Sequence, residues 1–352
     1  MKRAGWLGRG LLALLMLVLL AGCGEKIHRQ QSYVFGTLVE VTVYGEPEDK
    51  ARRVTDQVLK DFDEMHQTLH AWQPGTLERI NGIMALSKPD APAKAALPPG
   101  LIPILKDAAR LSELSEGLFN PAIGNLVRLW GFHSDTFEPR LPDPKEIGRL
   151  VRANPRMSDI HIDGLMLSDA NPAVRLDLGG YAKGYALDLA AAYLRSQGVR
   201  NALINIGGNI MALGDKGGTP WRVGIQHPRR AGALATLDLK DGEAIGTSGD
   251  YQRFFELGGK RYCHLIDPRT GWPADHTQAV TVIAHGAHAG TLSDVASKPL
   301  FIGGPGQWPR LADKMGVKEV LYVAADGSVE VTPDMRARLT WEKPAPATRV
   351  TQ

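Results

Sequence analysis

The stretch Asp177-Leu-Gly-Gly-Tyr-Ala-Lys-Gly-Tyr-Ala-Leu-Asp188 decides the fold of this 352-residue chain. It opens on a Gly-Gly turn, and apolar residues then recur at helical spacing as far as Gly198, which predicts a helix over 177–198. The sequence 202–206 predicts a short buried strand directly after it. Glycines and free N–H groups at a helix start favour an anionic ligand such as a pyrophosphate.

Lys183 lies in the first turn of this predicted helix. The helix dipole disfavours a cation there unless an anion lies nearby, so the position itself indicates function. The alternative is a structural turn that carries a surface lysine. The segment alone does not decide between the two, and it matches neither a Rossmann fingerprint nor a Walker loop.

Outward from this stretch, hydrophobic periodicity predicts one large α+β domain over 34–341, with mixed or antiparallel sheets, packed helices and room for two lobes. We expect helices at 49–69, 101–115 and 291–300. We expect strands at 34–44, 221–226, 233–239, 261–266 and 279–284, and a hairpin formed by 319–324 and 329–332. The Pro- and Ala-rich segment 89–99 predicts a loop, and 342–352 a flexible tail.

The N-terminus predicts export and lipid anchoring. Lys2, Arg3 and Arg9 precede ten uninterrupted apolar residues at 11–20, which is typical of a signal peptide and too short to cross a bilayer. Leu20-Ala-Gly-Cys23 resembles a bacterial lipobox, so we expect cleavage after residue 22, acylation of Cys23, a polar tether over 23–33 and a periplasmic location. An ordinary secretory signal is the alternative. Cys263 is the only other cysteine, so an internal disulfide does not account for Cys23.

Composition excludes two broad classes of protein. Apolar residues at 43% and charged residues at 22% are ordinary for a globular domain and exclude general disorder. Three of the 41 basic residues lie in the predicted signal peptide, so the rest balance the 38 acidic residues. A neutral mature chain offers no electrostatic basis for binding nucleic acid.

Two further clusters could carry chemistry. Thr247-Ser-Gly-Asp-Tyr251 and His264-Leu-Ile-Asp-Pro-Arg-Thr-Gly271 could line a polar site, although turn chemistry and a core histidine explain them equally well. Asp294, Ser297 and Lys298 share a helix face, and two of them offer oxygen ligands that suit Mg²⁺ beside a phosphate. The alternative is an ordinary Asp294–Lys298 surface pair worth about 0.3–0.5 kcal/mol. Zinc, EF-hand and G-x-S-x-G motifs are absent from the sequence.

In this order the segments resemble one family, the FAD:protein FMN transferases (ApbE family), from about residue 34 to residue 331. The strongest blocks are DLGGYAKGYALD (177–188), NALINIGGNI (201–210), WRVGIQHP (221–228), TSGDYQRFF (247–255) and HLIDPRTGWP (264–273), with FNPAIGNLVRLWGF (119–132) and FGT (35–37) in addition. The resemblance implies transfer of the FMN part of FAD to a Thr or Ser hydroxyl of an acceptor flavoprotein, with release of AMP and with Mg²⁺ as cofactor. It also implies an acceptor in a periplasm-facing respiratory complex.

The resemblance assigns roles residue by residue. Trp72 would stack on the isoalloxazine ring, His264 would handle the proton of the acceptor hydroxyl, and Asp294 would act with it in catalysis. The metal ion would be held by Gly180 through its carbonyl, Asp294 and Ser297. The residues expected to contact FAD are Phe35, Trp72, Phe119, Asn120, Asp177, Lys183 and Ile266.

The chain departs from the family pattern at three places. Asn120-Pro-Ala-Ile-Gly124 stands where members usually have Asp-Pro-Thr-Ile-Gly, and Cys263 replaces a usual Ser. Lys298 falls on the usual metal-binding Thr, and its ammonium would repel a divalent cation or partly stand in for it. Two alternatives therefore stay open: a Mg²⁺-dependent FAD pyrophosphatase, and an FAD-binding lipoprotein without catalysis.

Overall fold

The computed structural model describes residues 27–88, 90–169 and 171–351. Its centre is the predicted helix, α7 (Ala182–Ser196), which is followed by the hairpin strands β6 (Ala202–Ile206) and β7 (Asn209–Leu213). Tyr181 and Ala182 donate their backbone N–H groups to Leu178 O at 2.9 Å each, so the Gly-Gly turn leads straight into α7. The prediction for this stretch is confirmed, except that the helix begins at Ala182.

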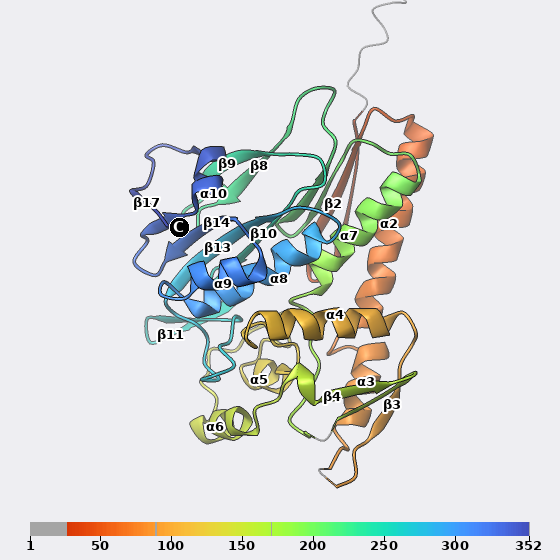
Figure 1. The fold of residues 1–352 in the computed structure, drawn as a ribbon, viewed down its shortest axis with the longest axis vertical. Helices are drawn as coiled ribbons and strands as arrows, with labels where there is room; N and C mark the ends of the chain where they lie inside the picture. Colours follow the sequence, from red (N-terminus) through yellow and green to blue (C-terminus); the bar gives the residue numbers. More distant parts are fainter. Residues whose placement is uncertain (1–26, 89, 170, 352) are drawn as a thin grey trace, which may run out of the picture.

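A nine-stranded sheet forms the core of the molecule (Figure 1). Its strands run in the order β1-β2-β6-β7-β10-β13-β14-β15-β17, and all neighbours are antiparallel except β15 and β17. The strands not yet given bounds are β1 (Ile27–Val34), β2 (Thr37–Tyr44), β10 (Ala244–Gly249), β13 (Thr277–Ala284), β14 (Glu319–Ala324), β15 (Val329–Val331) and β17 (Thr348–Val350).

Helices cover one face of this sheet (Figure 1). They are α2 (Glu48–Leu69), α7, α8 (Ala289–Gly303) and α9 (Trp308–Met315). Helix α2 buries Val54, Val58 and Phe62 at helical spacing against the strands. The opposite face packs against a small sheet of β8 (Trp221–Gln226), β9 (Ala233–Leu239) and β16 (Thr340–Trp341), together with α10 (Pro333–Arg338).

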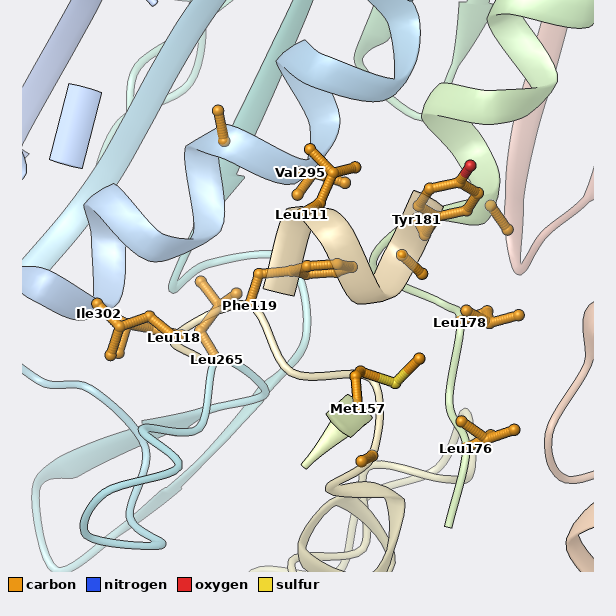
Figure 2. Close-up of a cluster of buried hydrophobic side chains, with 14 of the residues drawn as sticks. Leu111, Leu118, Phe119, Met157, Leu176, Leu178, Tyr181, Leu265, Val295 and Ile302 are labelled. Carbon is orange, nitrogen blue, oxygen red and sulfur yellow. The ribbon is translucent and has the colours of Figure 1, made fainter. Parts of the chain in front are cut away.

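A second lobe lies below the helices in Figure 1. It contains α3 (Thr76–Met84), β3 (Lys94–Ala96), α4 (Leu101–Leu114), α5 (Gly124–Leu129), α6 (Pro144–Ala153), β4 (Ile160–Asp163) and β5 (Met166–Asp169), and the hairpin of β11 (Phe254–Leu257) and β12 (Lys260–Cys263) lies nearby. Figure 2 shows that Leu111 of α4 and Val295 of α8 meet between the lobes, next to Phe119 from the loop after α4. All three belong to one buried cluster. This cluster contains residues of both lobes, so the chain is a single α+β domain, as predicted.

Several predicted boundaries were wrong because local sequence does not reveal pairing partners. Residues 27–33, expected in the tether, belong to β1, and the predicted strand 34–44 is interrupted by a turn at Phe35-Gly36. The predicted loop 89–99 contains β3, and the predicted flexible tail contains β17, paired with β15. The strand expected at 261–266 is β12, which ends at Cys263. Cys23 and the predicted signal peptide lie outside the described residues.

None of the helices in residues 27–351, apart from the two positions left out, combines the length and apolar character needed to cross a bilayer.

Candidate functional site

A cavity of about 700 Å³ opens where the β1–β2 turn, the end of α2 and the start of α7 meet loops of the second lobe. Every residue predicted to contact FAD lines it, and so do Gly180, His264 and Lys298. These positions are up to 263 residues apart in sequence, from Phe35 in the β1–β2 turn to Lys298 in α8. The seven predicted FAD contacts that line the cavity are Phe35, Trp72, Phe119, Asn120, Asp177, Lys183 and Ile266.

The turn before α7 forms one end of the cavity. Asp177 accepts the Gly179 N–H at 2.8 Å, which holds the turn and leaves the exposed Gly179 and the half-buried Gly180 on the cavity wall. Lys183 is the second residue of α7, and within the described residues no carboxylate lies within ion-pair distance of it. Burial lowers the pKa of Lys183, and nearby Asp294 opposes that shift. An anion at this end would therefore meet a glycine-rich helix start and a lysine without a partner.

The β1–β2 turn brings an aromatic ring to the cavity. Phe35 and Gly36 both have positive φ, at 56° and 68°, as a two-residue type I′ hairpin turn requires. A bulky residue is rare in this conformation, so the strain points to a role for the ring. Phe35 packs at 6.0 Å from Phe62 and 5.6 Å from His66, centroid to centroid.

Trp72 lies directly after α2 and is held from two sides. Its indole N–H donates to Asp177 at 3.2 Å, and the guanidinium of Arg175 lies 4.5 Å from its ring centroid. Asp177 thus joins the aromatic wall to the turn that carries Lys183. The ring of His133 packs on the same indole, with 5.5 Å between the ring centroids. A flavin could therefore contact only the edge of Trp72 and the part of its surface that these neighbours leave open.

Phe119, Asn120 and Ile266 contribute wall rather than polar contacts. Phe119 and Ile266 are only 5% and 3% exposed. The Asn120 amide is already used, because it donates to Pro155 O at 2.8 Å and accepts the Ala122 N–H at 3.0 Å. Their roles in contacting FAD stay predictions, and what these residues supply is the shape of the cavity wall.

His264 is fixed in one tautomer. Its Nδ1 lies 3.2 Å from the carbonyl oxygen of Arg253, and because a carbonyl only accepts, Nδ1 must carry the proton. The neutral ring then has an unprotonated Nε2. Burial lowers the pKa of His264 to about 3, with help from the charges of Arg253, Lys183 and Lys298. A neutral histidine on the cavity wall can accept a proton from a hydroxyl.

The predicted metal site does not fit a divalent cation. Asp294 and Ser297 are 2% and 1% exposed and do not line the cavity, unlike Gly180. Lys298 donates to Asp294 Oδ1 at 2.5 Å and to Asp294 O at 2.7 Å, while Oδ2 accepts the Gly184 N–H at 2.9 Å. The described residues contain no group of three or more His, Cys, Asp or Glu side chains suited to a metal ion. The alternative of an Asp294–Lys298 surface pair is confirmed in its partners. Its location was wrong, because the pair lies largely buried and not at the surface.

The remaining predicted cluster is mostly structural. Asp250 forms a two-point ion pair with Arg229, at 2.6 and 2.7 Å, and Asp267 binds Arg269 within its own turn. Ser248 meets Ser297 at 2.7 Å. Cys263 is buried, and burial raises the pKa of its thiol to about 12, which agrees with a packing role. Of the two predicted segments, 247–251 and 264–271, only residues 264–266 line the cavity.

Several polar residues of the cavity wall were not predicted from the sequence, among them His66, His70, His133 and Arg253. His66 and His70 are four residues apart at the end of α2, and this spacing on one helix face was the available signal. His70 accepts the N–H groups of Trp72 and Gln73 at 3.1 and 2.9 Å, so its Nδ1 is unprotonated and its Nε2 carries the proton.

Comparisons with known proteins agree with one another. The sequence model of the ApbE family matches residues 35–321. The FAD:protein FMN transferase of Rhodobacter capsulatus is 44% identical over 90% of this chain, and the chain spans 60% of that protein's length. The FAD:protein FMN transferase of Vibrio cholerae is 34% identical, over 78% of this chain and 82% of its own.

Solved structures resemble the fold as well. The ApbE protein of Thermotoga maritima superposes with a TM-score of 0.79 at 29% identity, over 89% of this chain and 99% of its own. The flavin transferase ApbE of Vibrio cholerae gives 0.75 at 26% identity, over 90% and 100%.

Proposed function

The chain belongs to the ApbE family, and from that premise we propose that it transfers the FMN part of FAD to an acceptor protein. One observation carries the proposal for this chain: seven residues expected to contact FAD, from segments far apart in sequence, line a single cavity. A cavity of about 700 Å³ is in the range of ligand sites in proteins.

In the proposed reaction the oxygen of a Thr or Ser hydroxyl of the acceptor attacks the phosphorus of the FMN half of FAD. A phosphoester bond forms, the bond from that phosphorus to the bridging oxygen breaks, and AMP leaves with the electron pair. His264 accepts the hydroxyl proton at Nε2, which its bond to Arg253 leaves free. Lys183 and the Gly179-Gly180 turn bind the phosphates.

The aromatic end of the cavity suits the flavin. Phe35 and Trp72 present ring surfaces, and the indole N–H bond to Asp177 fixes the Trp72 ring. The proposal includes no magnesium ion, because Lys298 takes up the oxygens of Asp294 that such an ion would need. In this proposal Asp294 binds Lys298 and the backbone of α7, and it is not a metal ligand.

Incubation of the protein with FAD and an acceptor that carries the D-x-x-[ST]-[ST] target tests the proposal. We expect a flavin-fluorescent acceptor band, and no band with an acceptor whose target hydroxyl is removed. His264→Asn should lower the transfer rate by about 100-fold or more. Each reaction is run with Mg²⁺ and with EDTA, so that a metal requirement does not hide activity.

The same assay separates the alternatives. AMP and free FMN released without acceptor would identify an FAD pyrophosphatase. Tight FAD binding with neither product under any metal condition would identify a flavin-binding protein without catalysis, an idea that the Lys298–Asp294 pair motivates.

We also propose that the acceptor is a flavoprotein of a respiratory complex facing the periplasm, and that the chain is anchored there through acylated Cys23. The support is the apolar run 11–20 followed by Leu20-Ala-Gly-Cys23. Cells fed labelled palmitate should label the wild-type protein and not Cys23→Ala. The variant should move from the membrane fraction to the soluble periplasmic fraction, and unchanged fractionation would refute the anchor.

A further inference from the structure

Lys298 holds a buried position that an ordinary surface lysine does not take. Its side chain is 15% exposed, and that of its partner Asp294 is 3% exposed. The ammonium donates twice to the same residue, to the carboxylate at 2.5 Å and to the backbone carbonyl at 2.7 Å. An ammonium has three N–H donors, so one remains for the cavity, which Lys298 lines.

Gly180 makes room for this lysine. A Cβ atom at Gly180 would lie 2.9 Å from Lys298 Cε and 3.2 Å from its Cδ. The lysine stem therefore crosses the glycine-rich turn at a position where any side chain would obstruct it. Lys298 consequently reaches the end of the cavity where Gly180 and Lys183 also lie.

The oxygens around the ammonium are already used. Asp294 Oδ2 accepts the Gly184 N–H at 2.9 Å, and Ser297 Oγ is bonded to Ser248 at 2.7 Å and to Asp294 O at 2.8 Å. Magnesium requires several free oxygen ligands in a nearly octahedral arrangement. Lys298 lines the cavity and binds Asp294 Oδ1, whereas Asp294 itself is buried and does not line the cavity, and the charge of Lys298 repels a second cation.

We infer that Lys298 supplies, as a fixed ammonium, the positive charge that the reacting phosphates need, and that FMN transfer by this chain requires no divalent cation. This inference rests on the proposed function. When the bond to the bridging oxygen breaks, negative charge collects on the departing AMP phosphate, and the free N–H of Lys298 stabilises it beside Lys183. Asp294 is then the residue that positions Lys298.

Two variants of Lys298 test the inference. Lys298→Met keeps the length of the stem and removes the charge, so transfer should fall by about 100-fold and Mg²⁺ should not restore it. Lys298→Thr removes the ammonium and adds a hydroxyl oxygen, so it should acquire binding of Mn²⁺ in the presence of FAD, read by electron paramagnetic resonance. Lys314→Met, which breaks a surface pair with Glu116, is the matched control and should behave as the wild type. Thermal unfolding of each variant checks that it is folded.

For the wild-type protein we expect no bound Mn²⁺ with FAD present, and equal transfer rates in EDTA and in Mg²⁺. Wild-type transfer that stops in EDTA and returns with Mg²⁺ would overturn the inference while leaving the proposed function intact. Stoichiometric Mn²⁺ binding by the wild-type protein would overturn it too, and this readout needs no transfer activity. Absence of transfer under every condition, with Mn²⁺ still excluded, would refute the proposed function and with it the role of Lys298 in transfer.

Discussion

His264 illustrates how a single side chain is set by its surroundings. The Arg253 carbonyl fixes its tautomer, and burial together with the positive charges of Arg253, Lys183 and Lys298 keeps the ring neutral. The pKa of about 3 lies well below the ordinary value of about 6.5 for histidine. The ring is therefore unprotonated throughout the neutral and mildly acidic range.

This lowered pKa predicts a pH dependence of stability. Between about pH 6.5 and 3, the unfolded chain binds a proton at His264 that the folded chain does not, so stability rises with pH across this window. The contribution is complete above pH 6.5 and is lost as the pH falls. One such group gives a slope of at most about 1.4 kcal/mol per pH unit.

Urea unfolding of the wild type and of His264→Asn at several pH values measures this slope. Other histidines with lowered pKa, among them His70 and His133, affect both proteins equally. The free energy of unfolding should therefore fall less steeply with acid in the variant. Parallel curves for the two proteins would contradict the assigned pKa.

Trp72 carries a second prediction at this scale. Trp72→Ala removes the ring and leaves Asp177 without the indole N–H, so FAD should bind about tenfold more weakly. Trp72→Phe keeps an aromatic surface and should lose less. Fluorescence titration with FAD measures both dissociation constants, and equal losses in the two variants would show that the hydrogen bond, not the ring, matters.

At the residue scale the sequence predicted the cavity wall well where motifs are contiguous. Asp177, Lys183 and His264 lie in blocks with a recognisable order, and all three face the same cavity. Helical spacing indicated Asp294 and Ser297 as metal ligands, and the family resemblance implied the same two residues together with the Gly180 carbonyl. That spacing does place Asp294 and Lys298 on one face, but it does not reveal that the lysine folds back onto the carboxylate and buries it.

At the scale of elements, the packing of α7 on α8 positions both lysines. A Cβ atom at Gly184 would lie 2.4 Å from Gly290 O and 2.7 Å from Asp294 Cβ, so the two helices touch backbone to backbone there. Asp188 strengthens the contact, because it accepts the Gly290 N–H at 2.7 Å and the Thr291 N–H at 2.8 Å. The start of α8 is thus capped by a side chain of α7.

Gly184→Ala should separate these helices. We expect the variant to lose about 1–3 kcal/mol of stability and to transfer FMN more slowly, since Lys298 and Asp294 move with α8. Gly82→Ala is the matched control: Gly82 is exposed in α3 with nothing within 4 Å of its Cβ position, so the change should stabilise by about 0.5–1 kcal/mol. Differential scanning calorimetry compares them, and a Gly184→Ala variant as stable as wild type would disprove the close contact.

The sequence predicts an element well when the residues of that element alone determine its structure. Helices α2 and α4 follow from a strong apolar face, and their observed bounds lie within one residue of those predicted. Strands β1 and β17 carry little apolar signal, because each lies at an edge of the large sheet and most of its residues are not buried. The pairing of β1 with β2 and of β17 with β15 cannot be predicted from the residues of β1 or β17 alone.

At the scale of the whole molecule, the cavity joins parts of the chain that belong to different cores. Phe35 packs on the cluster beneath α2 and on the cluster of the second lobe, whereas Ile266 belongs to the aromatic cluster of α5 and α6. A ligand that touches both walls therefore ties these cores together. Free energy from such binding adds to the stability of the entire fold rather than to one loop.

FAD should therefore raise the unfolding temperature of the whole protein in one cooperative transition. At about 100 times its dissociation constant, a ligand of the folded state adds about 2.7 kcal/mol, which corresponds to a shift of roughly 5 °C or more for a domain of this size. FMN and AMP are each one half of FAD and can make only part of its contacts, so at equal concentration each should give a smaller shift than FAD. Scanning calorimetry with the three ligands measures this, with Trp72→Ala as the variant whose FAD and FMN shifts fall while its AMP shift is kept. If FMN alone stabilised the protein as much as FAD, the AMP half would contribute nothing to binding, and the dinucleotide would not span the cavity.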